Sequence, residues 1–405
     1  MLKSKKLLAF ILSSILLGAF LHSESFFSGI TGGKLNFTAN PEADKYDPEL
    51  KIQAFFQGQF NFSENLWSHV ELSINTDDFI SAELFHTTPA DFSIDEISLI
   101  SKSQIDDTTN YFSIFMGTYE PIGSDIFLRR YFGVQPISSK ITESWLGMAG
   151  SILYPHFGLG ISDIIKFHKT PAALGFYAYL NHEDKKYFVI NADLRYAFVY
   201  RYLSFDFAGG VGAPLSNRYK NEDVWFAVDK FYWHAGTTIL IGNNYTQSLF
   251  IQAGLFNAPF TKSSSTITAS QKDIYLLVEP RFKIGATHLN ISIYSLPEDT
   301  VSKLQFVDDT LGINANIYAN SIAFGAKIIS FGTQFSYSFP EKYFLNLRRP
   351  DILLKSDFNV NITPYVSTNL LNGELHSQTT VKLMEFSKGP WYKAISFDVG
   401  YKSGL

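Results

Sequence analysis

The sequence has no cysteine and no excess of positive charge, and each absence excludes several classes of protein. Without a thiol, the chain cannot form a disulfide scaffold, a cysteine-ligated zinc or iron–sulfur site, a thiol nucleophile or a lipoprotein anchor. The net charge is -5 at pH 7. Such a balance offers no basic face for binding nucleic acid, so we expect no nucleic-acid partner.

Long apolar runs are also missing beyond residue 25, so the rest of the chain contains no candidate for a membrane-spanning helix. The mean hydropathy of +0.01 is too polar for a bundle of membrane helices. Such a mean hydropathy is typical of a chain with one surface that faces water and one that is apolar. The 38 Phe, 22 Tyr and 5 Trp supply the apolar surface that a disordered chain lacks.

The first twenty-five residues have the three-part pattern of an export signal. Three lysines stand among the first six residues, residues 7–21 are mostly apolar, and Ser23 and Ser25 offer small residues for cleavage. The apolar stretch is shorter than the roughly 20 residues of a spanning helix, which favours a cleaved peptide over an anchor. We therefore expect a signal peptide at residues 1–25 and one domain at residues 26–405.

The rest of the chain repeats with a period of two. Apolar Ile52, Ala54 and Phe56 alternate with polar side chains such as Gln53 and Gln57. Successive side chains of a strand point to opposite faces, so each such stretch has one apolar and one polar face. The same alternation occurs at residues 188–195, 203–207, 289–293, 313–320, 331–339 and 354–362.

Two architectures accommodate strands of this kind, a soluble sandwich and a membrane barrel. Sandwich strands run about 5 to 6 residues and turn their apolar face inward. Barrel strands need about 9 to 11 residues and turn it toward lipid. Length favours the barrel, because five alternating stretches have ten residues or more: 50–62, 186–197, 246–256, 354–363 and 394–405.

Two further features favour the barrel. The polar parity is rich in amides and hydroxyls, as a water-filled interior requires. Aromatic clusters such as Phe231, Tyr232 and Trp233 stand where strands should leave the hydrocarbon, and such rings favour the membrane interface. The sequence therefore predicts an all-β fold, a single antiparallel transmembrane β-barrel.

The C-terminus adds a resemblance. The final stretch alternates between apolar and polar residues, and it resembles the closing strand of bacterial outer-membrane β-barrel proteins, with apolar positions at Ile395, Phe397, Val399, Tyr401 and Leu405. The resemblance implies an outer-membrane location and, as partners, outer-membrane lipid and the barrel assembly machinery. Leu405 stands where the family usually has an aromatic residue, which suits a divergent lineage such as spirochaetes.

Chain length sets the expected size of the barrel. About 380 mature residues at roughly 20 per strand and connection give about 16 to 20 strands, with 18 as the best single number. Barrels of this width leave an aqueous lumen, which predicts a porin-like channel for small solutes. Two alternatives stay open. One is a carrier for hydrophobic compounds plugged by the segment Phe26–Asp47, and the other is an adhesin or structural barrel that acts through its loops. The sequence also leaves open whether the barrel forms a homo-oligomer.

Longer stretches without alternation are candidates for loops or for a constriction. Residues 119–145 bring together charged side chains that would create a transverse field across a narrow pore: Asp125, Arg129, Arg130, Lys140 and Glu143. The simpler interpretation, which we favour, is a solvated loop with ordinary charges. Arg348 and Arg349 raise the same question. Residues 155–172 suggest a short helix or a plug, centred on Ser162–Phe167.

Motifs for catalysis, metals or cofactors are not evident. The glycines at 158–160 and 209–212 do not complete a nucleotide-binding loop. The histidines are scattered, with no pair at helical metal spacing, so we expect lumen-facing histidines such as His69 and His376 and no metal. No nucleophile elbow marks any serine. We therefore expect no enzymatic activity and no cofactor.

Overall fold

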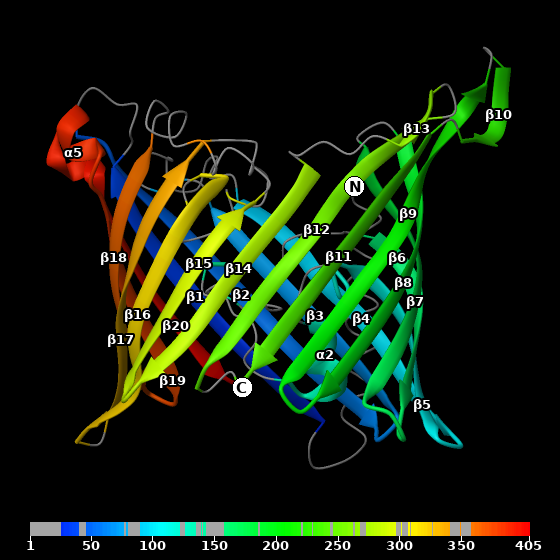
Figure 1. The fold of residues 1–405 in the computed structure, drawn as a ribbon, viewed down its shortest axis with the longest axis horizontal. Helices are drawn as coiled ribbons and strands as arrows, with labels where there is room; N and C mark the ends of the chain where they lie inside the picture. The colour runs from blue at the N-terminus through cyan, green and yellow to red at the C-terminus, as the bar shows by residue number, and fades with distance from the viewer. Residues whose placement is uncertain are drawn as a thin grey trace.

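The first and last strands pair with each other, and this pairing closes the sheet into a barrel (Figure 1). In β1 (Phe27–Ala39) and β20 (Ile395–Gly404), the antiparallel register runs from Ile30 opposite Gly404 to Phe37 opposite Phe397. Every other neighbouring pair around the wall is antiparallel as well. The predicted fold class, an all-β antiparallel barrel, is confirmed.

The structure is a computed structural model. It describes residues 26–39, 46–76, 78–79, 90–121, 126–134, 139, 141–142, 158–184, 187–219, 222–228, 230–243, 246–261, 264–267, 273–296, 301, 307, 309–325, 327–340, 349 and 358–405. The signal peptide expected at residues 1–25 lies outside these ranges and stays a prediction.

Between β1 and β20, the wall is built from long strands that follow one another in chain order. These are β2 (Pro48–Ser63), β3 (Leu66–Thr76), β4 (Ala90–Ile105), β5 (Thr108–Gly117), β6 (Gly158–Phe167), β7 (Ala172–Asp184), β8 (Tyr187–Tyr200), β9 (Leu203–Tyr219), β11 (Lys230–Gly242), β12 (Ser248–Thr261), β14 (Ile274–Ile284), β15 (Thr287–Ser295), β16 (Leu311–Phe324), β17 (Lys327–Phe339), β18 (Asn359–Leu370) and β19 (Gly373–Lys382).

Two short strands stand outside this ring. β10 (Glu222–Ala227) pairs with β9, and β13 (Ser264–Ile267) pairs with β12, both at one rim of the barrel (Figure 1). Of the twenty strands in the described sheet, the other eighteen form the wall. The predicted number of 16 to 20, with 18 as the best estimate, is confirmed. The remaining short elements are α2 (Ile126–Phe132), α5 (Glu385–Lys388) and η3 (Trp391–Ala394).

Alternation along each strand separates an apolar outer face from a polar inner one. On β16, the outward-facing Ile313 and Ile317 are 41% and 45% exposed, whereas Asn314 and Asn316 on the inner face are buried. Apolar residues exposed around a closed barrel are the surface that lipid covers in membrane barrels. Among the described residues, no helix is long and apolar enough to cross a membrane.

The two ends of the chain share the seam of the barrel. Ile395, Phe397, Val399 and Tyr401 lie in β20, and Leu405 follows its last residue. On the other side of the seam, Phe27–Ala39 is the first strand of the wall. The alternative of an N-terminal plug is therefore wrong for residues 27–39, because a strand that pairs with both β2 and β20 cannot occupy the lumen.

A second correction concerns residues 155–172. Residues 158–167 of this stretch form β6, paired with β5 and β7, and not a helix or plug. Its alternation is obscured because Ile164, on the inner face, is apolar and fully buried. Ile164 packs in the cluster that includes Phe127 and Tyr131, so it does not face water. The prediction from alternation assumes that the inner face of each strand is polar. It fails at β6, where a protein segment in place of water lies against the inner face.

Candidate functional site in the lumen

The chain leaves the wall after β5 and enters the lumen, and we call its described residues there, 118–121, 126–134, 139 and 141–142, the lumenal segment. Gly117 permits the departure. Its φ of 105° lies in the left-handed region, and a Cβ there would be 2.4 Å from the backbone oxygen of Asp95. Thr118 donates its backbone N–H to the same oxygen at 2.6 Å. A β-bulge at Asp95 interrupts the register between β3 and β4, so the inward turn begins at an irregular point of the wall.

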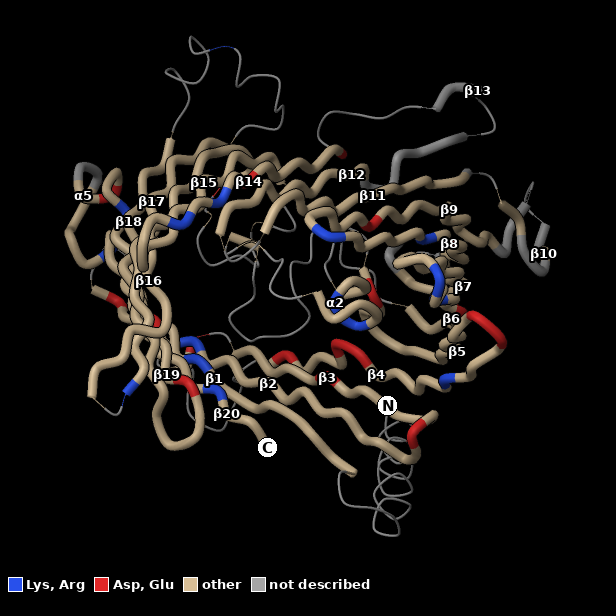
Figure 2. Tube along the Cα trace, turned by 60° about the horizontal axis from the view of Figure 1, so that its bottom comes forward, with Lys and Arg blue, Asp and Glu red and all other residues tan. Residues whose placement is uncertain are grey.

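Helix α2 lies within the barrel, against β8 and β9 (Figure 2). Phe127, Leu128 and Tyr131 are all buried. Their spacing places them on one face of a helix, which is why this stretch does not continue the strand alternation. Lys166 of β6 donates to the backbone oxygen of Tyr131 at 2.7 Å. Of the two interpretations of residues 119–145, the described residues follow the inward-folded one.

Arg130 attaches the helix to the β4 wall. Its Nη2 donates to the two carboxylate oxygens of Glu96 at 2.9 and 3.2 Å, and its Nη1 donates to Oε1 of Glu120 at 3.1 Å. Burial by itself lowers the pKa of Arg130, but the negative charges around it, that of Glu96 foremost, raise the pKa well above its ordinary value. The guanidinium therefore stays charged and holds two carboxylates together.

Arg195 of β8 attaches the lumenal segment to the wall through Glu120. The buried Arg195 pairs with Asp206, donating from Nε at 2.8 Å, and it donates from Nη1 to the backbone oxygen of Glu120 at 2.6 Å. Tyr177 donates to the carboxylate of Glu120 at 2.5 Å. Glu120 has a φ of 48°, a conformation that is uncommon for residues other than glycine. These bonds hold that conformation in place.

Tyr119 links the charged groups to the aromatic packing. Its hydroxyl donates to Ser113 at 2.8 Å, and its ring stacks on Phe115 with centroids 4.5 Å apart. Burial, together with the negative charge of Glu120, raises the pKa of Tyr119 to about 12. The hydroxyl is therefore neutral at every physiological pH.

The lumenal segment also reaches the far wall. Ser139 donates to the carboxylate of Glu279 on β14, and both residues are buried. Glu279 also accepts from Arg281 at 2.7 Å and from Ser292. The described residues of this segment are bonded to β4, β6, β7, β8 and β14, which are opposite parts of the wall.

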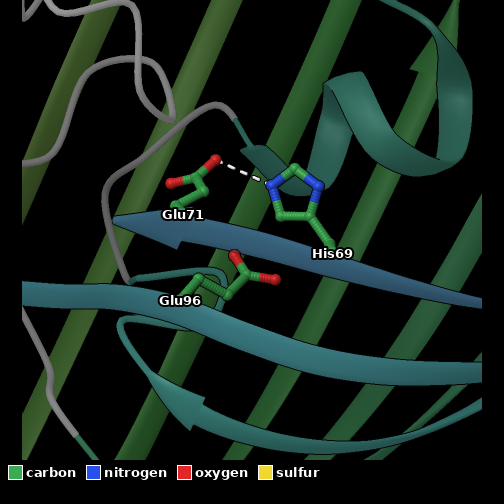
Figure 3. Close-up of side chains that lie close together, drawn as sticks. All are labelled: His69, Glu71 and Glu96. Atoms are coloured by element: carbon green, nitrogen blue, oxygen red, sulfur yellow. Dashed lines mark hydrogen bonds and ion pairs between the residues drawn. The ribbon is translucent and has the colours of Figure 1, made fainter. Parts of the chain in front are cut away.

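A pocket lies beside α2, next to β2, β3 and β4, and it contains about 890 Å³ of empty space. Three of its lining groups lie close together (Figure 3). His69 and Glu71 stand two residues apart on one face of β3, with Nε2 and Oε1 2.7 Å apart. Glu96 of β4 is directly opposite Glu71 in the register. Both carboxylates are buried.

The inner face of β15 to β19 is different, and we call this region the amide wall. At mid-strand it carries uncharged polar side chains in register across neighbouring strands: Asn290, Ser292, Asn314, Asn316, Gln334, Ser336, Asn361, Thr363, Gln378 and Thr380. Within the described residues, the amide atoms of Asn314 and Gln334 have no hydrogen-bond partner. This face presents donors and acceptors without net charge.

Three of the seven charged residues predicted for a constriction lie within the described residues. Arg130 is held by Glu96 and Glu120, Arg129 lines the pocket beside α2, and Arg349 is exposed. The others lie outside the described residues: Asp125, Lys140, Glu143 and Arg348.

Sequence reasoning missed the partners of these residues. Glu96, Arg195 and Asp206 are charged residues in the middle of long alternating strands, on the inward parity. A charge at such a position has to face the lumen, because lipid excludes it, and this was the signal that could have identified them. The sequence does not show which two such charges meet across strands.

Comparisons with known proteins find similar folds. No protein-family model matches the chain, and no curated protein matches it. Among solved structures, a multiple mutant of the porin of Rh. blastica is 8% identical, with a TM-score of 0.44 over 94% of this chain and 99% of that one. A loop-deletion mutant of OmpT, an outer membrane protein of Vibrio cholerae, is 10% identical, with a TM-score of 0.38 over 94% and 98%. At these identities and TM-scores, the likeness supports no statement about the activity of this chain.

Proposed function

We propose that this outer-membrane β-barrel is a channel for the diffusion of small hydrophilic solutes, with the lumenal segment as its constriction. The observation that carries the proposal is the attachment of that segment to several parts of the wall through buried charges. A mobile loop would obstruct the lumen irregularly, whereas a segment held by buried ionic bonds narrows it to a constant shape. The polar inner face is compatible with water and dissolved solutes.

The charge of the constriction would set its preference among solutes. Arg129 lines the pocket, so its guanidinium lies where it can act on a passing ion. We extend the same proposal to the other predicted charges: Asp125, Lys140, Glu143, Arg348 and Arg349. Fixed charges at a narrow point select solutes by charge and dipole.

Single-channel recording in planar bilayers tests the proposal. Purified, folded barrel should give discrete conductance steps, and Arg129→Gln should shift the reversal potential in a salt gradient toward cation preference. Arg201→Gln is the matched control. It removes the same charge from the turn between β8 and β9, outside the lumen. A folded barrel that conducts no current would exclude the channel.

A further inference from the structure

We propose that His69, Glu71 and Glu96 form a binding site for a divalent transition-metal ion on the lumenal wall. One ligand atom from each of the three residues lies within 4.8 Å of the others (Figure 3). Imidazole nitrogen and carboxylate oxygen are ligands that zinc accepts at about 2.0 to 2.2 Å. The proposal concerns the folded barrel and does not depend on whether it conducts solutes.

Strand geometry gathers the three ligands. Residues two apart on a strand share a face, which brings His69 and Glu71 together. The bulge at Asp95 then sets Glu96 directly opposite Glu71. The sequence analysis expected no metal because it considered helical spacing, and a ligand pair on one strand with a third on its neighbour has no such signature.

The balance of charge favours a cation here. Like charges directly opposite each other on neighbouring strands are destabilising, and Glu71 and Glu96 are both buried. Two arginines of α2 line the same pocket, Arg129 and Arg130, and Arg130 is shared between Glu96 and Glu120. His69 contacts Oε1 of Glu71 at 2.7 Å. An ion between Glu71 and Glu96 would reduce their repulsion.

Neighbouring groups already orient the ligands. Gln57 donates to Oε1 of Glu71 at 2.8 Å, and Ser98 donates to Oε1 of Glu96 at 2.7 Å. Outer-shell hydrogen bonds of this kind hold ligating groups in place at metal sites. Tetrahedral ligands at about 2.0 to 2.2 Å from one ion lie about 3.4 Å apart. His69 Nε2 and Glu71 Oε1 are 2.7 Å apart, so they need to separate by roughly 0.7 Å for an ion to replace the proton between them.

The pocket beside α2 supplies an entry path and room for water ligands. It is lined by the three proposed ligands and by polar side chains including Gln57 and Gln59. Arg130 competes with the ion for Glu96, since its Nη2 contacts both oxygens of that carboxylate. Binding would therefore free one oxygen of Glu96 while Arg130 keeps its bond to Glu120.

Isothermal titration with Zn²⁺ tests the site on folded barrel in detergent, after any histidine tag has been removed. We expect one ion per chain, and binding weaker by at least about tenfold in His69→Gln and in Glu71→Gln. His376→Gln is the matched control. His376 stands two residues from Gln378 on β19 with a 3.2 Å contact, and the carboxylate two residues before it, that of Glu374, pairs with Lys402. Equal binding in the wild type and His69→Gln would overturn the site.

A second measurement uses the wild-type chain alone, in case a variant does not fold. Diethyl pyrocarbonate modifies accessible imidazole nitrogens, and mass spectrometry reports the extent at each histidine. Zn²⁺ should slow the modification of His69 several-fold and leave that of His376 unchanged in the same sample. Protection of neither, or of both alike, would overturn the proposal. Failure of conductance would leave both of these readouts unaffected.

Discussion

Two regions of the lumen differ in the kind of polar side chain that lines them, charged pairs in one and uncharged amides and hydroxyls in the other. The region formed by β3 to β9 and the lumenal segment, which we call the clamped region, contains buried charges in pairs, such as Arg195 with Asp206 and Arg130 with Glu96. The amide wall of β15 to β19 instead has uncharged side chains that are equally buried, such as Asn314 and Gln334. The difference coincides with what each region contacts, since the clamped region holds α2 against the wall.

The comparison indicates that charge marks the places where the chain must be held. A buried ion pair contributes little net stability, but removing one partner is costly because it leaves an unpaired charge. Such pairs fix one arrangement of the lumenal segment against alternatives. An amide wall tolerates change more readily, because each group loses only a neutral hydrogen bond.

The largest expected effect separates the two regions directly. Arg195→Met leaves Asp206 buried without its partner and should lower the free energy of unfolding by about 3 to 5 kcal/mol, measured by urea denaturation in detergent. Asn314→Leu, on the amide wall, should be neutral or stabilising, because the amide of Asn314 is unpartnered within the described residues. Adding Asp206→Leu to Arg195→Met should recover much of the loss. Similar losses in the free energy of unfolding for Arg195→Met and Asn314→Leu would contradict the proposed difference between the clamped region and the amide wall.

The outer faces of the two regions should not differ. Ile161 in the clamped region and Ile317 on the outside of the amide wall are 48% and 45% exposed. An arginine at either position should cost about 2 to 4 kcal/mol in lipid bilayers, because lipid solvates charge poorly. Unfolding in vesicles measures both. A negligible cost at Ile317 would contradict its assignment to the lipid-facing surface.

Alkaline pH should weaken the clamped region selectively. The pKa of Tyr119 is raised from 10.0 to about 12, so its contribution to stability is fully present below pH 10 and is lost as the pH rises through 12. Two pKa units correspond to about 3 kcal/mol. Urea unfolding between pH 8 and pH 12 should show this loss in the wild type and a smaller one in Tyr119→Phe. Identical pH profiles of the wild type and Tyr119→Phe would mean that ionisation of Tyr119 does not contribute to the loss of stability at alkaline pH.

The smallest expected effect concerns the rigidity of the clamp. Glu120→Gln weakens the bonds from Arg130 and Tyr177, and it should cost about 2 kcal/mol while Glu96 keeps Arg130 in place. Single-channel records should become noisier, because the lumenal segment is held less firmly. Gln334→Ala on the amide wall should leave the noise unchanged, and equal noise in both variants would show that the clamp does not set it.

Much of the fold could be predicted because membrane barrels follow a local rule. Alternation at Ile313, Asn314 and Ile317 reports which way each side chain faces, and it needs no knowledge of the rest of the chain. Strand length and chain length then limit the number of strands. The rule failed at Ile164, where protein fills the lumen in place of water. It also could not reveal that Phe127 and Leu128 belong to a helix inside the barrel.

The candidate site was predicted less well, because its contacts join residues far apart in sequence. Arg130 was identified as a charge in a long loop, but its partner Glu96 lies in an earlier strand, and Ser139 meets Glu279 across the lumen. The pairing of His69 and Glu71 with Glu96 depends on one bulge in β4.

By itself, the sequence determined the all-β barrel, the size of that barrel and the outward direction of its apolar residues, because these properties follow from the period, length and number of strands. Only the tertiary structure decided which charges meet, where the chain turns into the lumen and which carboxylates face each other. Those features depend on register and on a single bulge, and a shift of one residue in register would change every contact across the wall.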